Sequence, residues 1–223
     1  MKSRMESLDM LANNIANTGT TGFKSDREFY GLYEHELPVI EKHWTDFSQG
    51  TVTPTGNPLS LALSGKGFFA LNTPTGVIYT RNGNFQISKA DELATPVGYT
   101  LRNTLDNGKP IKVDPTQPID IGKDGLVRQG GQDIGQIEVD SLDSQAIGKL
   151  GSTYFAMTDP KSPVSIAPGA EVLQGQLEQS NVPVAESAVK LVGVMRQFEM
   201  LQKAMNLGSE MSKAAIEQVA KVS

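Results

Sequence analysis

The sequence predicts an α+β protein, with a mostly antiparallel β domain in its centre and helices at both ends that pair as a coiled coil. Two patterns lead to this prediction. Near each end, apolar residues recur every three or four positions, which is typical of helices that bury one narrow stripe. Between the ends, apolar and polar residues alternate in short runs separated by turn sequences, which is typical of antiparallel strands.

The first element, residues 1–23, is predicted to be the N-terminal helix of the coiled-coil domain together with its exit. Its apolar side chains are spaced by four and three residues in turn, as in a heptad pattern. These side chains are Met1, Met5, Leu8, Ala12 and Ile15. Gly19 and Gly22 are expected to end the helix, because glycine readily adopts the positive φ of a helix C-terminus.

Residues 24–58 are predicted to be an irregular connector, because they are polar and rich in turn residues, as in DFSQGTVTPTGNP over 46–58. Trp44 and Phe47 stand out in this polar stretch. They form either a small local core or docking points for a neighbouring molecule, and the sequence favours neither alternative.

Residues 59–175 are predicted to be the β domain. A period of two begins with Leu59, Leu61 and Leu63 and recurs in short runs along this region. Turn dipeptides fall between such runs, and each predicts a hairpin because Asn, Asp and Gly tolerate positive φ. These dipeptides are Asn82-Gly83, Asn107-Gly108 and Asp124-Gly125. Many short strands with hairpin turns indicate a sandwich-like or partly barrel-like domain.

Residues 176–223 are predicted to contain the C-terminal helix of the coiled-coil domain, which begins near Asn181 and Pro183. One stripe steps by three and four residues and contains no charged side chain. It consists of Ala188, Leu191, Met195, Phe198, Gln202, Met205, Ser209, Ser212, Ile216 and Val219. At 1.5 Å per residue such a helix is ~58 Å long, far longer than the N-terminal helix. We therefore expect the helices to pair and to leave apolar surface for further copies of the protein.

The composition argues against several classes of function. The formal net charge is −5 and Lys and Arg do not cluster, which argues against binding to nucleic acid. The chain has no cysteine, which excludes disulfides and thiol catalysis. No apolar run reaches the ~18 residues expected of a membrane-spanning helix, so we expect no direct membrane insertion. The N-terminal residues contain no apolar signal core, so we expect any export to proceed without a cleaved signal peptide.

No catalytic, cofactor or metal site is predicted. The stretch GKGFFA over 65–70 matches a dinucleotide-binding fingerprint, but a strand rather than a helix is expected to follow it. We therefore interpret it as a β-turn. His35 and His43 match no metal-binding array, and both lie in the connector, where they support no Ser-His-Asp triad.

Three asparagines, Asn13, Asn14 and Asn17, lie in the stretch LANNIANTGTTGFK over 11–24. A buried amide requires hydrogen-bond partners. In a packed array of helices it can bond to a neighbouring helix and fix the register. The alternative is local, with Asn17 ending the helix and Asn13 or Asn14 facing water.

The same stretch resembles the N-terminal signature of the bacterial flagellar rod and hook proteins. Three further stretches resemble motifs of that family and occur in the same order, so the resemblance covers nearly the whole chain. They are DFSQGTVTPTGNPLSLALSGKGFFAL over 46–71, YTRNGNFQIS over 79–88 and QGQLEQSNVPVAESAVKLVGVMRQFEMLQKAM over 174–205. The chain differs from the family pattern at Glu92, where glycine is usual, and at Pro183, where asparagine is usual.

The resemblance implies a non-enzymatic subunit of the flagellar basal body. Such a subunit would be exported by the flagellar export apparatus without a cleaved signal peptide. It would assemble with copies of itself and with neighbouring rod and hook subunits into the periplasmic rod that transmits torque. The chain length and the stretch DREFYGLYEHE over 26–36 resemble the proximal rod type most, with the distal rod type as the alternative. A rival interpretation is a monomeric β-domain module that binds peptidoglycan.

We predict an assembly surface on the terminal helices. Its residues are Leu8, Asn13, Asn14, Ile15, Asn17, Phe23, Leu191, Met195, Phe198 and Met205. The apolar members would pack against neighbouring helices, and the asparagines would form polar contacts between subunits.

Overall fold

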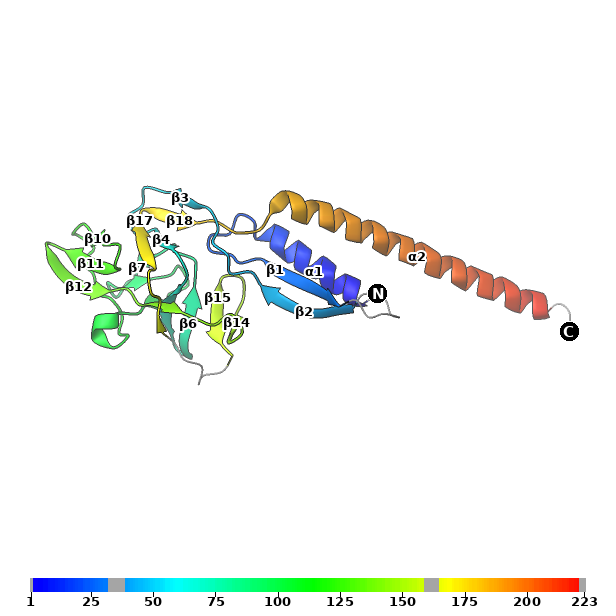
Figure 1. The fold of residues 1–223 in the computed structure, drawn as a ribbon, viewed down its shortest axis with the longest axis horizontal. Coiled ribbons are helices and arrows are strands. Elements are labelled where there is room, and N and C mark those ends of the chain that lie inside the picture. Colours follow the sequence, from blue (N-terminus) through cyan, green and yellow to red (C-terminus); the bar gives the residue numbers. More distant parts are fainter. Residues whose placement is uncertain (1, 32–38, 159–164, 221–223) are drawn as a thin grey trace. The chain divides into compact units, whose positions relative to one another are not determined.

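The computed structural model describes the backbone of residues 2–31, 39–158 and 165–220 (Figure 1). Side chains are described over residues 5–28, 44–158 and 165–213. The helices are α1 (Lys2–Ala16) and α2 (Val184–Ala220), with a short 3₁₀ helix η1 (Thr104–Asp106). The strands are β1 (Asp26–Gly31), β2 (Val39–Thr45), β3 (Val52–Pro54), β4 (Leu61–Ser64), β5 (Phe68–Thr73), β6 (Gly76–Thr80), β7 (Gln86–Ile87), β8 (Leu93–Ala94), β9 (Thr100–Leu101), β10 (Asp120–Ile121), β11 (Leu126–Gln129), β12 (Gln132–Gln136), β13 (Val139–Ser141), β14 (Ile147–Lys149), β15 (Tyr154–Met157), β16 (Ser165–Ile166), β17 (Glu171–Gln174) and β18 (Gln176–Glu178).

The chain divides into two compact units. The helical unit contains α1, the strand pair β1–β2 and α2. The β unit comprises residues 17–25 and 45–182. This arrangement confirms the predicted α+β class with two terminal helices and mostly antiparallel sheets.

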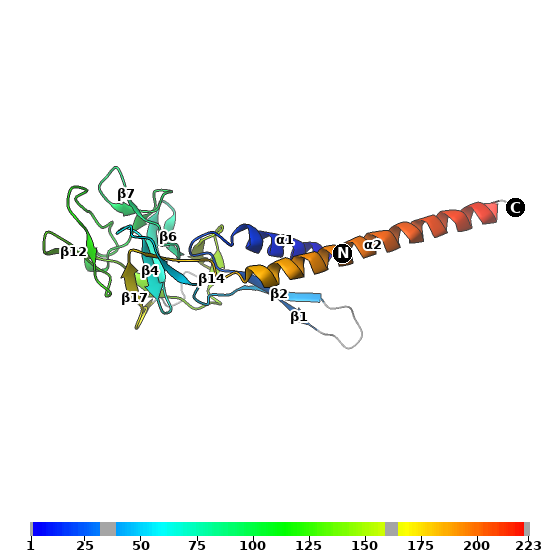
Figure 2. The same cartoon turned by 90° about the horizontal axis from the view of Figure 1, so that it is seen from above.

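In the helical unit, α1 lies beside the first part of α2 and also contacts β1 (Figure 2). The two helices have 15 and 37 residues, so α1 matches less than half of α2. The Ser187 amide donates to the Pro183 carbonyl at 2.9 Å, so Pro183 opens the first turn of α2, as expected of proline at a helix start.

Strands occur where an irregular connector was expected over 24–58. β1 pairs with β2, and β3 pairs with β18, with Val52 opposite Glu178. Residues 39–45 contain Val, Ile, Trp and Thr, which favour strands, although charged residues interrupt them. β3 could not be predicted from local patterns, because it forms by pairing with β18, which lies more than a hundred residues away in the sequence.

The β unit has two apolar cores on opposite faces of β5. Phe69 and Leu71 point into the larger core, and Phe68 and Ala70 point into the smaller one. β5 is thus buried on both faces within the main sheet, whose order is β14-β15-β6-β5-β9-β8-β7. The larger core also includes Leu61, Leu63, Ile78, Phe85, Leu93, Leu101, Ile111, Val127 and Ile137. The pairings described for this unit are antiparallel, as the alternating runs predicted.

One of the predicted hairpin turns joins paired strands directly. Asp124-Gly125 lies between β10 and β11, which pair, and Gly125 has a φ of 78°. Asn107-Gly108 has positive φ at both residues but closes η1. The hairpin expected at Asn82-Gly83 is wrong, because β6 and β7 pair with other strands. Gly83 instead allows a close approach, since a Cβ there would overlap the Leu61 carbonyl oxygen.

The turn around Glu92, where the family pattern has glycine, is built with a different residue in the left-handed conformation. Asp91 takes the positive φ, at 57°. The Ser88 amide donates to the Glu92 carbonyl at 2.8 Å and closes the turn. Aspartate tolerates this conformation better than most side chains, so the substitution leaves the turn intact.

Three charged side chains, Lys24, Arg81 and Glu178, form a buried ion cluster in the β unit. The Lys24 Nζ lies 2.5 Å from the Glu178 Oε1, and the Arg81 Nη1 lies 3.0 Å from the Glu178 Oε2. The exposed fractions of the three side chains are 0%, 4% and 0%. Burial lowers the pKa of both Lys24 and Arg81, and the Glu178 carboxylate opposes that effect.

Backbone groups also bond to the ion cluster, although the buried Arg81 Nε has no hydrogen-bond partner among the described residues. The Gly50 amide donates to the Glu178 Oε1 at 2.8 Å. Lys24 donates to the Ser48 carbonyl and Arg81 donates to the Gly65 carbonyl, both at 2.7 Å. Buried charges are tolerated when they are paired and hydrogen-bonded in this way.

The ion cluster lies where the chain leaves α1 and approaches α2. The Gly22 amide donates to the Glu178 carbonyl at 2.8 Å, and the Ser25 amide donates to the Asn181 Oδ1 at 2.7 Å. Gly22 has a φ of 69°, and a Cβ there would overlap the backbone of Arg81. The β unit therefore holds the segment after α1 and the segment before α2 side by side.

Replacing Glu178 by Gln should destabilise the β unit strongly, because the buried ammonium and guanidinium groups would lose their counter-charge. We expect a loss of about 3–5 kcal/mol in the free energy of unfolding. Urea denaturation of the full chain, followed by circular dichroism, measures it. The matched control is Glu171→Gln, which breaks an exposed pair with Lys123 and should cost less than about 1 kcal/mol. Equal small losses in both variants would contradict the proposed role of the ion cluster.

Asp140 on β13 should make the stability of the β unit depend on pH. Its side chain is buried, and its Oδ2 has no hydrogen-bond partner among the described residues. Burial and the nearby Glu138 raise the pKa of Asp140 to about 6, against the opposing charge of Arg102. Since the folded pKa exceeds the unfolded one, the stabilising contribution is complete below about pH 4 and is lost as the pH rises through 6.

In the Asp140→Asn variant this dependence should disappear. The wild-type chain should lose about 1–2 kcal/mol of stability between pH 4 and pH 7 through this group, and the variant should lose correspondingly less. Urea denaturation of both chains at several pH values gives the two slopes. Identical slopes would show that Asp140 titrates normally in the folded protein.

Candidate assembly surface

The first part of α2 presents one side to α1. Ser187 is buried, and Leu191, Val194 and Phe198 are half-buried. Their spacing of four, three and four residues places them on one face of the helix. The predicted residues Leu191 and Phe198 belong to this face, whereas Met195 lies beside it and is 49% exposed, because Val194 occupies its expected place.

On α1, the predicted apolar residues are partly buried and partly exposed. Leu8 and Ile15 are half-buried, and Leu11, which lies between them, is buried. Because α1 contacts both α2 and β1, these side chains are partly covered within the helical unit. Each still exposes part of its surface.

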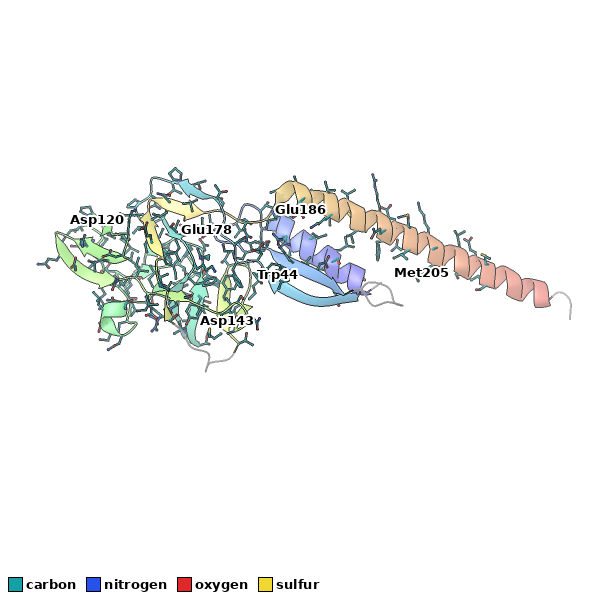
Figure 3. The ribbon with its side chains drawn as sticks, in the orientation of Figure 1. Trp44, Asp120, Asp143, Glu178, Glu186 and Met205 are labelled. Atoms are coloured by element: carbon teal, nitrogen blue, oxygen red, sulfur yellow. The ribbon has the colours of Figure 1, made fainter. Side chains whose placement is uncertain are left out.

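The far part of α2 exposes its apolar side chains to solvent. Every residue described over 199–213 is exposed. The exposed apolar side chains there are Met200, Leu201, Met205, Leu207 and Met211. Figure 3 shows side chains projecting from this part of α2, with Met205 labelled. An exposed apolar surface on a long helix is typical of a site for association with another protein.

Asn14 uses its amide within the helical unit. It is buried, its Nδ2 donates to the Asp26 carbonyl at 2.8 Å, and its Oδ1 accepts from the Asp26 amide at 3.0 Å. The side chain therefore pairs with the start of β1 in the way that a backbone group would. This differs from the alternative in which Asn14 faces water, and it accounts for the amide without a neighbouring subunit.

The other two asparagines have different surroundings. The Asn17 carbonyl accepts from the Thr20 amide at 3.1 Å, and its Oδ1 accepts from the Thr20 hydroxyl at 3.2 Å. Asn17 thus has the local role at the end of the helix that the sequence left open. Asn13 is exposed, so its amide lies at the surface of α1.

Phe23 lies inside the β unit and not on a surface. Its side chain is fully buried, and the Lys149 ammonium lies 4.3 Å from the centre of its ring. The Lys149 Nζ also donates to the Lys24 carbonyl at 2.7 Å. Phe23 therefore does not lie on the exposed surface to which the sequence analysis assigned it. Its position directly before Lys24 makes it part of the packing around the ion cluster.

The two aromatic residues of the connector have separate roles. Phe47 packs edge-on against Phe68 and Phe155, with ring centres 5.5 and 5.3 Å apart, so it belongs to the smaller core. Trp44 remains 46% exposed in the helical unit, and the Arg27 guanidinium lies 5.7 Å from its ring centre. His35 and the side chain of His43 lie outside the described part of the chain.

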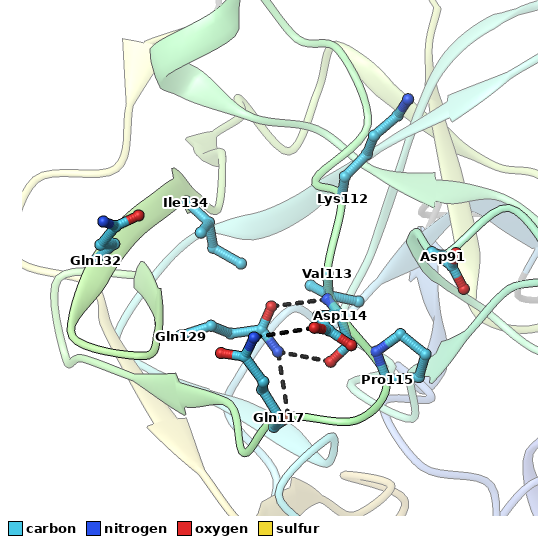
Figure 4. Close-up of a pocket in the computed structure, with 9 residues that line it drawn as sticks. All are labelled: Asp91, Lys112, Val113, Asp114, Pro115, Gln117, Gln129, Gln132 and Ile134. Carbon is cyan, nitrogen blue, oxygen red and sulfur yellow. Dashed lines mark hydrogen bonds between the residues drawn. The ribbon is translucent and has the colours of Figure 1, made fainter.

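A shallow cavity of about 450 Å³ in the β unit is lined by both polar and apolar side chains (Figure 4). Gln129 spans it, accepting from the Asp114 amide at 2.8 Å and donating to the Asp114 and Gln117 carbonyls at 2.9 and 3.2 Å. Hydrogen bonds from Thr116 lower the pKa of Asp114. These groups hold a loop together, which accounts for their polarity without a ligand.

Three further observations bear on candidate sites. Among the described residues, His, Asp and Glu side chains form no group of three arranged to hold a metal ion. Within the same residues, neither helix has the length and apolarity needed to cross a bilayer. The stretch GKGFFA leads into β5, a strand, as the sequence predicted.

Comparison with known protein families gives three matches along the chain. Residues 3–24 match the family described as flagella basal body rod protein. Residues 62–129 match the flagellar hook protein FlgE/F/G D1 domain. Residues 173–218 match the flagellar basal body rod FlgEFG protein C-terminal family. The matches thus include α1 with its exit, the centre of the β unit and most of α2.

Individual relatives cover nearly the full chain. The flagellar basal-body rod protein FlgF of Caulobacter vibrioides is 33% identical over 96% of this chain and 92% of the relative. FlgF of Mesorhizobium japonicum is 29% identical, over 94% and 90% of the two chains. The rod protein FlgG of Bacillus subtilis is 30% identical, over 94% and 92%. By these matches the chain belongs to the family of flagellar basal-body rod proteins, which points to a structural and non-enzymatic role.

Proposed function

We propose that this chain is a structural subunit of the bacterial flagellar basal-body rod and that it assembles through its terminal helices. The observation that carries the proposal is the exposed apolar surface of α2 over 199–213. In a chain whose full-length relatives are rod proteins, such a surface is best explained by contacts with other subunits. The partners are copies of this chain and neighbouring rod or hook subunits.

The terminal helices would pair as a coiled coil within this assembly. The contact between α1 and α2 and the spacing of Leu191, Val194 and Phe198 support this pairing. Leu8 and Ile15 would supply the opposing side chains from α1. Met205 lies seven residues beyond Phe198 and continues the same face where α1 no longer accompanies α2, so we assign it to contacts between subunits.

We assign the chain to the proximal rod type, named FlgF, with the distal rod type FlgG as the alternative. The higher identity to the Caulobacter vibrioides FlgF than to the FlgG of the same organism, 33% against 27%, supports this choice. The location that follows is the periplasmic rod of the basal body, reached through the flagellar export apparatus without a cleaved signal peptide. The rival peptidoglycan-binding module gains no support from the cavity at Gln129, where Gln129, Asp114 and Gln117 bond to one another.

Assembly of the purified full chain tests the proposal. Sedimentation velocity over a range of concentrations should reveal species larger than the monomer, alone or with a purified rod relative. Expression of the chain in a strain that lacks its own copy should restore swimming. Two results together would contradict the rod assignment: the purified chain stays monomeric under all these conditions, and the strain that lacks it still swims.

Charge introduced on the far part of α2 should weaken assembly. In Met205→Asp a carboxylate would be buried at the contact without a partner, so we expect self-association at least tenfold weaker, measured by sedimentation. The matched control is Asn206→Asp, which adds the same charge at the adjacent exposed position and should change association much less.

Phe198→Asp should abolish motility while circular dichroism shows a folded β unit. Normal swimming of that variant would count against assembly through α2.

A further inference from the structure

Exposed methionines of α2 can be oxidised at the sulfur atom. The exposed fractions of Met200, Met205 and Met211 are 61%, 59% and 72%. Oxidation of methionine to the sulfoxide follows the accessibility of the sulfur and turns an apolar, flexible side chain into a polar one. By contrast, Met157 in the β unit is half-buried.

These methionines lie on more than one side of the helix. Met200 and Met211 share a face with Ala204 and Leu207, at a spacing of four, three and four residues. Met205 lies on the face that continues from Phe198. The two apolar faces of the far part of α2 therefore each carry at least one thioether.

We propose that Met200, Met205 and Met211 are an oxidation site that controls self-association of the chain. The proposal rests on the assembly function proposed above. The sulfur lone pair attacks one oxygen of a peroxide, the O–O bond breaks, and an S–O bond forms. The sulfur loses two electrons, and the rest of the peroxide leaves as water, or as an alcohol if the peroxide is an organic hydroperoxide.

The effect on assembly follows from the polarity of the product. A sulfoxide oxygen accepts hydrogen bonds, and burying it against apolar side chains leaves that acceptor without a partner. The contact is therefore weakened at each oxidised position. Assembly in turn covers the sulfurs, so oxidation acts on the unassembled chain and the assembled chain is protected.

The experiment treats the full chain with hydrogen peroxide before and after assembly. Mass spectrometry locates the sulfoxides, and sedimentation measures self-association. We expect sulfoxides at Met200, Met205 and Met211 in the unassembled chain, association at least tenfold weaker, and restoration by methionine sulfoxide reductases. Peroxide added after assembly should leave these positions largely unoxidised.

A variant separates these positions from the other methionines. The triple variant Met200→Leu, Met205→Leu and Met211→Leu keeps the apolar volume and retains Met5 and Met195, which are 54% and 49% exposed. It should associate as the wild-type chain does and be insensitive to peroxide. Equal loss of association in the variant and the wild type, or normal association of the fully oxidised wild type, would overturn the proposal. The untreated wild type reports on the assembly function itself: if it does not associate, that function fails and this proposal fails with it.

Discussion

The architecture of the β unit depends on one carboxylate. Glu178 pairs with both Lys24 and Arg81 in an environment closed to water, and it also accepts a hydrogen bond from the Gly50 amide. Isolated, each of these charges would be costly to bury, so the three are stable there only together. The ion cluster thereby fixes the arrangement of three segments that are distant in the sequence, because their charges are paired only in that arrangement. Phe23, Gly22 and Asn181 then pack and bond around that arrangement.

The two units distribute polar and apolar groups in opposite ways. The β unit places full charges in its interior, whereas the far part of α2 places apolar side chains in water. The first is tolerable because the partners are in the same chain. The second is unfavourable for an isolated chain and becomes favourable only when another molecule covers the surface. A rod subunit has such molecules at each contact, which is why the family assignment and the exposed helix support each other.

The sequence predicted what depends on local periodicity. The period of three or four residues located both helices, and the period of two located the strands around Leu61, Phe69 and Leu101. It failed where the decisive partner is distant. β3 is a strand because it pairs with β18, Gly83 leaves room for the Leu61 carbonyl, and the buried Phe23 ring contacts the distant Lys149. Glu178 and Arg81 lay within recognised motifs, but nothing in their spacing indicated that they meet. Met195 was one position from the face toward α1, because the two candidate faces differ by a single residue there.

The separation of 154 residues between Lys24 and Glu178 has a consequence for the time course of folding. A contact between such distant segments requires a large loop to close, and folding is slower when native contacts are of this kind. During synthesis, which proceeds from the N-terminus, Lys24 appears long before its counter-ion. The ion cluster cannot form until Glu178, at the start of the last fifth of the polypeptide, is also present.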